Sequence, residues 1–176
     1  MSNYRRAREP GALYFFTLVS HGRRPLLTDP DLRASLRLAI QDVRLRYPFR
    51  IEGWVLLPDH LHCIWRLPAG DADFGMRWSL IKRQVSQTWE DPACINSSRQ
   101  MRGESALWQR RFWEHLIRDE QDYERHMDYL HWNPVRHGLV QRVEEWPWSS
   151  YHRLVREGIY PPGWGGVGEQ EGVFGE

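Results

Sequence analysis

The chain has 176 residues, a length that fits one domain. Its formal net charge is +1, and so small a charge does not by itself indicate a protein that binds polyanions. No apolar run approaches the ~20 residues needed to span a bilayer, which excludes a membrane-spanning helix and predicts a cytoplasmic protein. Cys63 and Cys94 form no Cys-x-x-Cys pair, which argues against a disulfide scaffold or a structural zinc site, so we expect two free thiols.

Arginine supplies all but one of the 24 basic residues, and Lys82 is the exception. The guanidinium group binds phosphates and guanine edges in bidentate fashion, which favours a nucleic-acid partner. A GC-rich coding sequence would give the same bias, so both interpretations stay open. The ten tryptophans are equally ambiguous, since most belong in a core and a minority could stack on unpaired bases.

The first half of the chain alternates strand and helix patterns. Residues 1–11, with Arg5, Arg6 and Arg8, are either a disordered leader or a basic arm that follows nucleic acid. Residues 12–20 are aromatic and β-branched, which predicts a buried strand. Asp29 and Pro30 are typical of a helix start, and an apolar stripe continues to residue 47.

A hairpin and a second helix follow. Residues 50–57 predict a strand that turns at Pro58-Asp59 into a strand carrying His60 and His62. Asp73 is a candidate cap for an amphipathic helix over residues 74–89, whose polar side holds Lys82 and Arg83. Residues 91–106 are expected to form a basic loop, and residues 112–117 a fourth strand.

The order strand, helix, strand, strand, helix, strand predicts an α+β fold of the ferredoxin-like split βαβ type, with both helices on one face of a four-stranded antiparallel sheet. A third helix, from about residue 120 to 132, could cover the open face. Because proline disfavours helical geometry at the residue before it, we expect Pro134 to end this helix at Asn133. We expect residues 1–157 to form one domain and the glycine-rich residues 158–176 a loosely ordered tail.

Successive side chains of a strand point to opposite faces, so His60 and His62 share one face while Leu61, Cys63 and Trp65 line the other. Two imidazoles on one face can hold a metal ion. A His-x-His pair alone is more often structural, because histidine is commonly buried with a hydrogen-bonded partner.

On the third helix Tyr129 and Asn133 lie one turn apart, which places a phenol beside an amide oxygen that could bind a metal. His126 lies on the same side. Glu114, at the end of the fourth strand, could support the site as a hydrogen-bonding partner. Four other histidines lack a paired geometry and are expected at the surface or in loops: His115, His131, His137 and His152.

The joint pattern resembles the REP-associated tyrosine transposases, a branch of the IS200/IS605-like single-tyrosine nucleases with a His-hydrophobe-His (HUH) motif. The resemblance covers residues 12–150 and rests on these motifs: Leu57-Pro58-Asp59-His60-Leu61-His62, Trp108-Gln109, Ile117-Arg118-Asp119, Tyr129-x-x-x-Asn133-Pro134-Val135-Arg136-His137-Gly138-Leu139-Val140 and Trp146-Pro147-Trp148-Ser149-Ser150.

The resemblance implies a metal-dependent endonuclease and strand transferase acting on single-stranded DNA hairpins of REP type. Tyr129 would form a 5′-phosphotyrosine and release a 3′-hydroxyl, and the ester would keep the bond energy so that no ATP is needed. His60, His62 and Asn133 would hold Mg²⁺ or Mn²⁺. Either the ion or a neighbour such as His126 would favour the phenolate, since the phenol pKa starts near ~10.

The implied partner is a single-stranded DNA hairpin of REP type, which places the protein at the nucleoid. Candidate phosphate contacts are Arg5, Arg6, Arg8, Lys82, Arg83, Arg110, Arg111 and Arg136. The short linker before Tyr129 and the apolar anchor after it predict a monomer with its tyrosine in cis, whereas the insertion-sequence relatives are dimers that exchange this helix. Two alternatives are a catalytically silent hairpin-binding module of the same fold and a small metal hydrolase that uses water instead of Tyr129.

Overall fold

A computed structural model describes residues 8–89 and 107–165, and its elements follow the predicted order. A 3-10 turn, η1 (His21–Arg23), precedes the first helix. The sheet and its two crossover helices are β1 (Leu13–Val19), α1 (Pro30–Arg46), β2 (Arg50–Leu56), β3 (His60–Arg66), α2 (Phe74–Thr88) and β4 (Trp113–Leu116). The strand order is β2-β3-β1-β4 and every neighbouring pair is antiparallel, which confirms the ferredoxin-like split βαβ arrangement.

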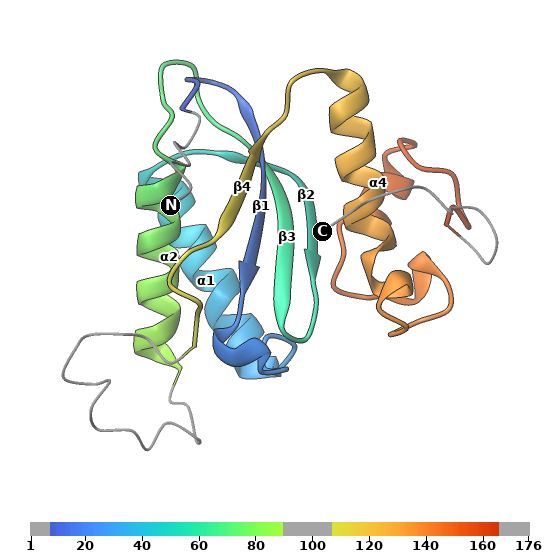
Figure 1. Cartoon of the computed structure of the whole chain (residues 1–176), viewed down its shortest axis with the longest axis horizontal. Coiled ribbons are helices and arrows are strands. Elements are labelled where there is room, and N and C mark those ends of the chain that lie inside the picture. Colours follow the sequence, from blue (N-terminus) through green and yellow to red (C-terminus); the bar gives the residue numbers. More distant parts are fainter. Residues whose placement is uncertain (1–7, 90–106, 166–176) are drawn as a thin grey trace, which may run out of the picture.

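Both crossover helices begin where the sequence places them. The Asp29 carboxylate accepts the backbone N–H groups of Asp31 and Leu32, and that of Asp73 accepts the N–H of Met76. Figure 1 shows α1 and α2 together on one side of the sheet. Between them and the sheet lies the first core, in which the rings of Trp65 and Trp78 stack at 4.0 Å.

The opposite face of the sheet is covered by α4 (Glu120–Arg136), seen in Figure 1 beside β2 and β3. Met127 and Leu130 of this helix pack on Val55 and Ile64 in a second core. The helix approaches β2 closely at Gly53, where an added Cβ would lie 2.6 Å from the Met127 sulfur. The third predicted helix therefore forms and docks on the predicted face.

The predicted end of this helix at Asn133 is wrong, because α4 continues through Pro134 to Arg136. Proline lacks a backbone N–H, but the last turn is held by other bonds: the His137 N–H donates to the Asn133 carbonyl and the Leu139 N–H to the Pro134 carbonyl, both at 3.0 Å. Gly138, with φ +66°, supplies the left-handed residue that ends the helix.

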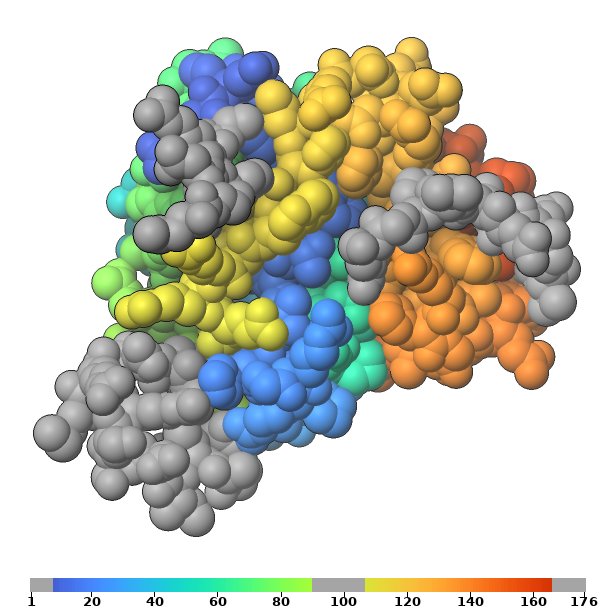
Figure 2. Space-filling model, viewed as in Figure 1, coloured from blue at the N-terminus to red at the C-terminus, as the bar shows by residue number. Residues whose placement is uncertain are grey.

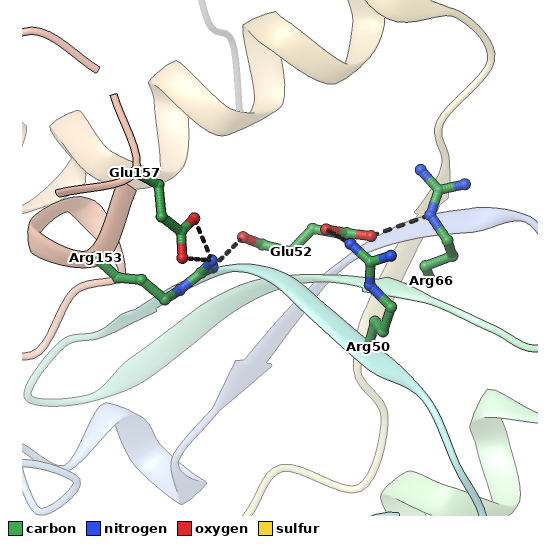
Figure 3. A network of polar contacts seen from close by, with 5 residues as sticks. All are labelled: Arg50, Glu52, Arg66, Arg153 and Glu157. Atoms are coloured by element: carbon green, nitrogen blue, oxygen red, sulfur yellow. Dashed lines mark hydrogen bonds and ion pairs between the residues drawn. The ribbon is translucent and has the colours of Figure 1, made fainter. Parts of the chain in front are cut away.

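The segment after α4 folds back onto the β2 edge of the sheet. It contains η2 (Val143–Glu145) and α5 (Tyr151–Arg156). The Trp146 indole N–H donates to the Leu56 carbonyl at 3.0 Å, and residues 148–150 exchange backbone hydrogen bonds with β2. Figure 3 shows a further link, in which Arg153 donates to the Glu52 carbonyl while the Glu52 carboxylate binds arginines of β2 and β3.

Residues 158–165 are not the loosely ordered tail expected for them. Tyr160 is buried, its hydroxyl donates to the Asp128 carboxylate of α4 at 2.7 Å, and its ring packs against Trp164. The other expectations for the tail (residues 166–176), for Arg5 and Arg6, for Cys94 and for the loop at 91–106 lie outside the described residues. Within the described part, Cys63 is a buried free thiol and no helix is long and apolar enough to cross a membrane.

Candidate active site

The two histidines of β3 face α4, as the strand alternation predicts, while Leu61, Cys63 and Trp65 belong to the core under α1 and α2. The register aligns one row of side chains across the sheet on the α4 face. This row runs from β2 to β4 as Val55, His62, Thr17 and Trp113. His60 and His62 are buried, at 4% and 3% exposure, and their ring centroids are 4.9 Å apart.

The Asp59 carboxylate orients the His60 ring. The Nδ1–H of His60 donates to Asp59 Oδ1 at 2.6 Å, and Arg23 donates to the other carboxylate oxygen at 3.2 Å. Burial opposes ionisation of Asp59, but these partners outweigh it and lower the pKa of the carboxyl. A carboxylate at Nδ1 fixes the tautomer and leaves the Nε2 lone pair for a ligand, which is the usual arrangement around metal-binding histidines.

The Thr17 hydroxyl does the same for His62, with 2.8 Å between Thr17 Oγ1 and His62 Nδ1. Burial lowers the pKa of His62 well below its ordinary range, and the nearby charges of His60, His137 and Arg136 act in the same direction. The ring is therefore neutral. Its Nε2 is buried and has no hydrogen-bond partner among the described residues.

Three residues on one stripe of α4 face this histidine pair. Tyr129, Asn133 and His137 are four residues apart, so they follow one another along one side of the helix. The Tyr129 ring lies 5.3 Å from that of His62, and the His137 ring lies 5.1 Å from that of His60. Asn133, between them, is 1% exposed, and neither atom of its amide has a partner in the described part of the chain.

Two further side chains define the surroundings of the Tyr129 ring. The Arg136 guanidinium carbon lies 5.6 Å from the ring centroid, which places a positive charge beside the phenol. Phe15, buried in β1, contacts His62 at 5.3 Å and Tyr129 at 6.0 Å between centroids.

The donor set fits a divalent cation. A buried imidazole nitrogen and a buried amide oxygen without partners are costly unless something binds them. His62 Nε2 and Asn133 Oδ1 are such atoms, and His60 presents Nε2 beside them because Asp59 holds its other nitrogen. Mixed imidazole and amide ligation suits a hard or borderline divalent ion.

The structure does not bring Glu114 to this site. Glu114 pairs with Phe16, whose ring lies in the core under α1 and α2, so the carboxyl group points to the face opposite His60 and His62. The supporting role expected for Glu114 is therefore wrong. The two neighbours of Glu114 in β4, Trp113 and His115, point to the α4 face.

Two of the residues expected to contact DNA, Lys82 and Arg110, touch each other. The Lys82 ammonium donates to the backbone carbonyls of Gln109 at 2.6 Å and Arg110 at 3.4 Å, and thus ties α2 to the segment before β4. Arg8, Arg83, Arg110, Arg111 and Arg136 are exposed.

Of the four histidines expected at the surface or in loops, one is buried, while His137 is exposed. His131 is fully buried, and its ring lies against Tyr160. His115 stacks on His126 at 4.5 Å. The His115 ring donates to the Asp122 carboxylate, and the His126 ring donates to the Asp122 backbone carbonyl, with its Nδ1 3.1 Å from the carboxylate. His126 is thus engaged in a second group, and this arrangement gives no support to the expectation that it activates Tyr129.

Residues that sequence reasoning missed are Thr17, Trp113, Asp122 and His137. Asp122 and His137 left a local signal, since each lies four residues, about one helical turn, from a residue already considered: Asp122 from His126, and His137 from Asn133. Thr17 and Trp113 join the site through cross-strand register, which no local pattern shows. Trp113 is 50% exposed at the end of the row that contains His62.

Two described proteins are similar to this chain over most of its length. The chain is 45% identical over 166 residues to the REP-associated tyrosine transposase of Escherichia coli (strain K12), covering 94% of this chain and 92% of that protein. It is also 45% identical over 168 residues, 94% of each chain, to a protein of Haemophilus influenzae (strain ATCC 51907 / DSM 11121 / KW20 / Rd) that is described as a putative REP-associated tyrosine transposase.

A solved REP-associated tyrosine transposase bound to a REP hairpin superimposes with a TM-score of 0.80 and 42% identity, covering 99% of this chain and all of that one. A scan against family models matches none. The two relatives are far above the identity at which fold and family are shared over whole chains. The chain belongs to the REP-associated tyrosine transposases, and it is a transposase of the single-tyrosine HUH type.

Proposed function

We propose that this transposase cleaves and rejoins single-stranded DNA at REP-type hairpins, with Tyr129 as nucleophile and a divalent ion held by His60, His62 and Asn133. One observation carries the proposal: within a single chain, α4 presents Tyr129 against His62 and, one turn on, an amide without partners among the described residues. A relative bound to a REP hairpin supports the substrate class.

In this scheme the Tyr129 oxygen attacks the phosphorus, the bond from phosphorus to O3′ breaks, and O3′ takes up a proton. The product is a 5′-phosphotyrosine and a free 3′-hydroxyl. A later attack by a DNA hydroxyl reverses the step, because the tyrosyl ester keeps the energy of the broken bond.

Each side chain of the site has a defined task. Asp59 and Thr17 bind the Nδ1 atoms of the two imidazoles and so leave both Nε2 atoms for the ion. Arg136, beside the Tyr129 ring, stabilises the negative charge that develops on the phenol oxygen as it attacks. When bound, Mg²⁺ or Mn²⁺ supplies Lewis acidity to the non-bridging oxygens of the phosphate.

We infer that the enzyme is a monomer with its tyrosine in cis, because α4 is tied at both ends to the sheet of its own chain. The linker from β4 to α4 consists of the three residues between Leu116 and Glu120, and the segment after α4 is anchored on β2 through Trp146 and residues 148–150. Exchange of α4 between chains would have to break this anchor. The enzyme would work at the nucleoid, and its exposed arginines, such as Arg8, Arg83, Arg110, Arg111 and Arg136, are candidates for phosphate contacts.

The test is covalent trapping. The protein is incubated with labelled single-stranded REP hairpins and Mn²⁺ and then separated on a denaturing gel. We expect a labelled protein band with wild type, none with Tyr129→Phe, and none in excess chelator. Hairpin binding without any adduct would support a catalytically silent module instead, and full cleavage by Tyr129→Phe would support a hydrolase that uses water.

The cis arrangement has its own test. Mixing Tyr129→Phe protein with His60→Ala protein pairs an intact metal site in one chain with an intact tyrosine in the other. We expect no cleavage. Restored cleavage would show that the half-sites meet between chains and would overturn the monomer.

A further inference from the structure

A second group of metal-binding side chains lies between β4 and the first turns of α4. It consists of His115 from β4 and of Asp122 and His126 from α4, whose candidate ligand atoms all lie within 4.8 Å of one another. In Figure 2 the β4 segment and the start of α4 meet at the surface on the viewed face. We propose that this group, here called the β4–α4 triad, binds a divalent transition-metal ion of the zinc class.

The donor types favour that class of ion. Two imidazoles and one carboxylate are a common protein ligand set for Zn²⁺, with the remaining position left to water, whereas Mg²⁺ and Ca²⁺ prefer oxygen ligands. Asp122 is 10% exposed, His126 19% and His115 23%, so the group is sheltered but open to an ion.

The charge of the triad also favours a cation. Partial burial disfavours the Asp122 carboxylate, but donors from His115 and the Arg118 N–H outweigh it and lower its pKa. Burial lowers the pKa of His126, although its bond to the Asp122 carbonyl opposes the shift. At neutral pH Asp122 is thus a carboxylate and His126 a neutral imidazole, states in which both groups can bind a metal ion.

The ring nitrogens of His115 and His126 that lie nearest Asp122 form hydrogen bonds with it in this structure. The His115 Nε2–H donates to Asp122 Oδ2 at 2.8 Å, and the His126 Nδ1–H lies 2.8 Å from the Asp122 carbonyl and 3.1 Å from Oδ1. Metal binding would shift these imidazole protons to the opposite ring nitrogens. The two rings already stack with an interplanar angle of 15°, so small side-chain rotations would bring the nitrogens to one ion.

The ion would fasten the tyrosine helix to the sheet. His115 is in β4, while Asp122 and His126 are in the first half of α4, about two turns and one turn before Tyr129. The Phe15 ring touches His126 at 4.9 Å and Tyr129 at 6.0 Å, and therefore lies between the triad and the nucleophile. An occupied triad would restrain both α4 and this ring.

The experiment counts ions and does not depend on the proposed cleavage reaction. Chelator-stripped protein is equilibrated with Zn²⁺, desalted and analysed for bound metal. To remove the candidate active-site ion, His62→Ala serves as the background. We expect one equivalent of Zn²⁺ in His62→Ala and an at least ten-fold weaker affinity in His62→Ala combined with His115→Gln or with Asp122→Asn.

Circular dichroism controls for misfolding, because both double variants must keep the spectrum of the His62→Ala parent. A thermal scan adds a second measurement: Zn²⁺ should raise the Tm of His62→Ala and leave the Tm of the double variants unchanged. His62→Ala that binds no Zn²⁺, or double variants that bind it as tightly as their parent, would overturn the proposal.

Discussion

The hydroxyl of Thr17 should control how well His62 binds a metal ion, and Thr17→Val tests this with almost no change of shape. The substitution removes the oxygen that lies 2.8 Å from His62 Nδ1 and leaves that nitrogen without this partner. For Nε2 to bind a metal, Nδ1 must carry the proton and donate it to Thr17. Valine cannot accept it, so the ring loses both its fixed tautomer and its orientation.

The substitution should change two quantities, the unfolding free energy of the metal-free protein and its affinity for the metal ion. A buried donor left without its acceptor costs about 1–3 kcal/mol of unfolding free energy, and His62 is 3% exposed. Loss of such an orienting partner typically weakens metal binding by about 10–100-fold, which corresponds to roughly 1.4–2.7 kcal/mol. We therefore expect the Tm of the metal-free protein to fall by roughly 2–10 °C and the Kd for Mn²⁺ to rise about 10–100-fold.

Isothermal titration with Mn²⁺ and a thermal scan of metal-free protein measure both quantities. Thr17→Ser is the matched control, because it keeps the hydroxyl and loses only a methyl group. Serine should bind Mn²⁺ nearly as wild type. If Thr17→Val bound Mn²⁺ with wild-type affinity, or if serine and valine weakened binding equally, the hydroxyl would not be the controlling group and the reasoning would fail.

Four further outcomes follow from the structure. Leu130→Ala should lower the unfolding free energy by about 2–5 kcal/mol in urea titrations, because Leu130 is fully buried where α4 docks on the sheet. Trp113→Ala should weaken binding of a hairpin with a single-stranded flank by about 1–3 kcal/mol, but not of a blunt hairpin, if its half-exposed ring stacks a base. Arg136→Ala should slow adduct formation roughly 2–5-fold while Arg136→Lys keeps most of the rate, as measured by quenched time courses. Burial lowers the pKa of His131 to about 3, so below pH 6.5 the unfolded chain binds a proton that the folded chain does not. The unfolding free energy should therefore fall as the pH drops from about 6.5 toward 3, by up to about 1.4 kcal/mol per pH unit. His131→Gln should flatten this dependence in urea titrations between pH 7 and 5.

Local patterns in the sequence determined the elements and which side of each element carries the chemistry. Asp29 and Asp73 cap their helices as predicted, because capping needs only a carboxylate and the first N–H groups of the same helix. Strand alternation placed His60 and His62 on one face, and helical spacing placed Tyr129 and Asn133 on one stripe. These periodicities are properties of neighbouring residues, so the sequence alone shows them.

Only the tertiary structure decided what meets across the sheet. Thr17 reaches His62 through the β1–β3 register, and the β1–β4 register puts His115, not Glu114, on the α4 face. The tertiary structure also decided where α4 ends. Pro134 stays inside the helix because it is buried, and the carbonyls of the last turn together with Gly138 complete the helix beyond it. The burial of His131 and Tyr160, and the meeting of His115 with Asp122 and His126, depend on how α4 and the returning chain pack on the sheet, which no local spacing encodes.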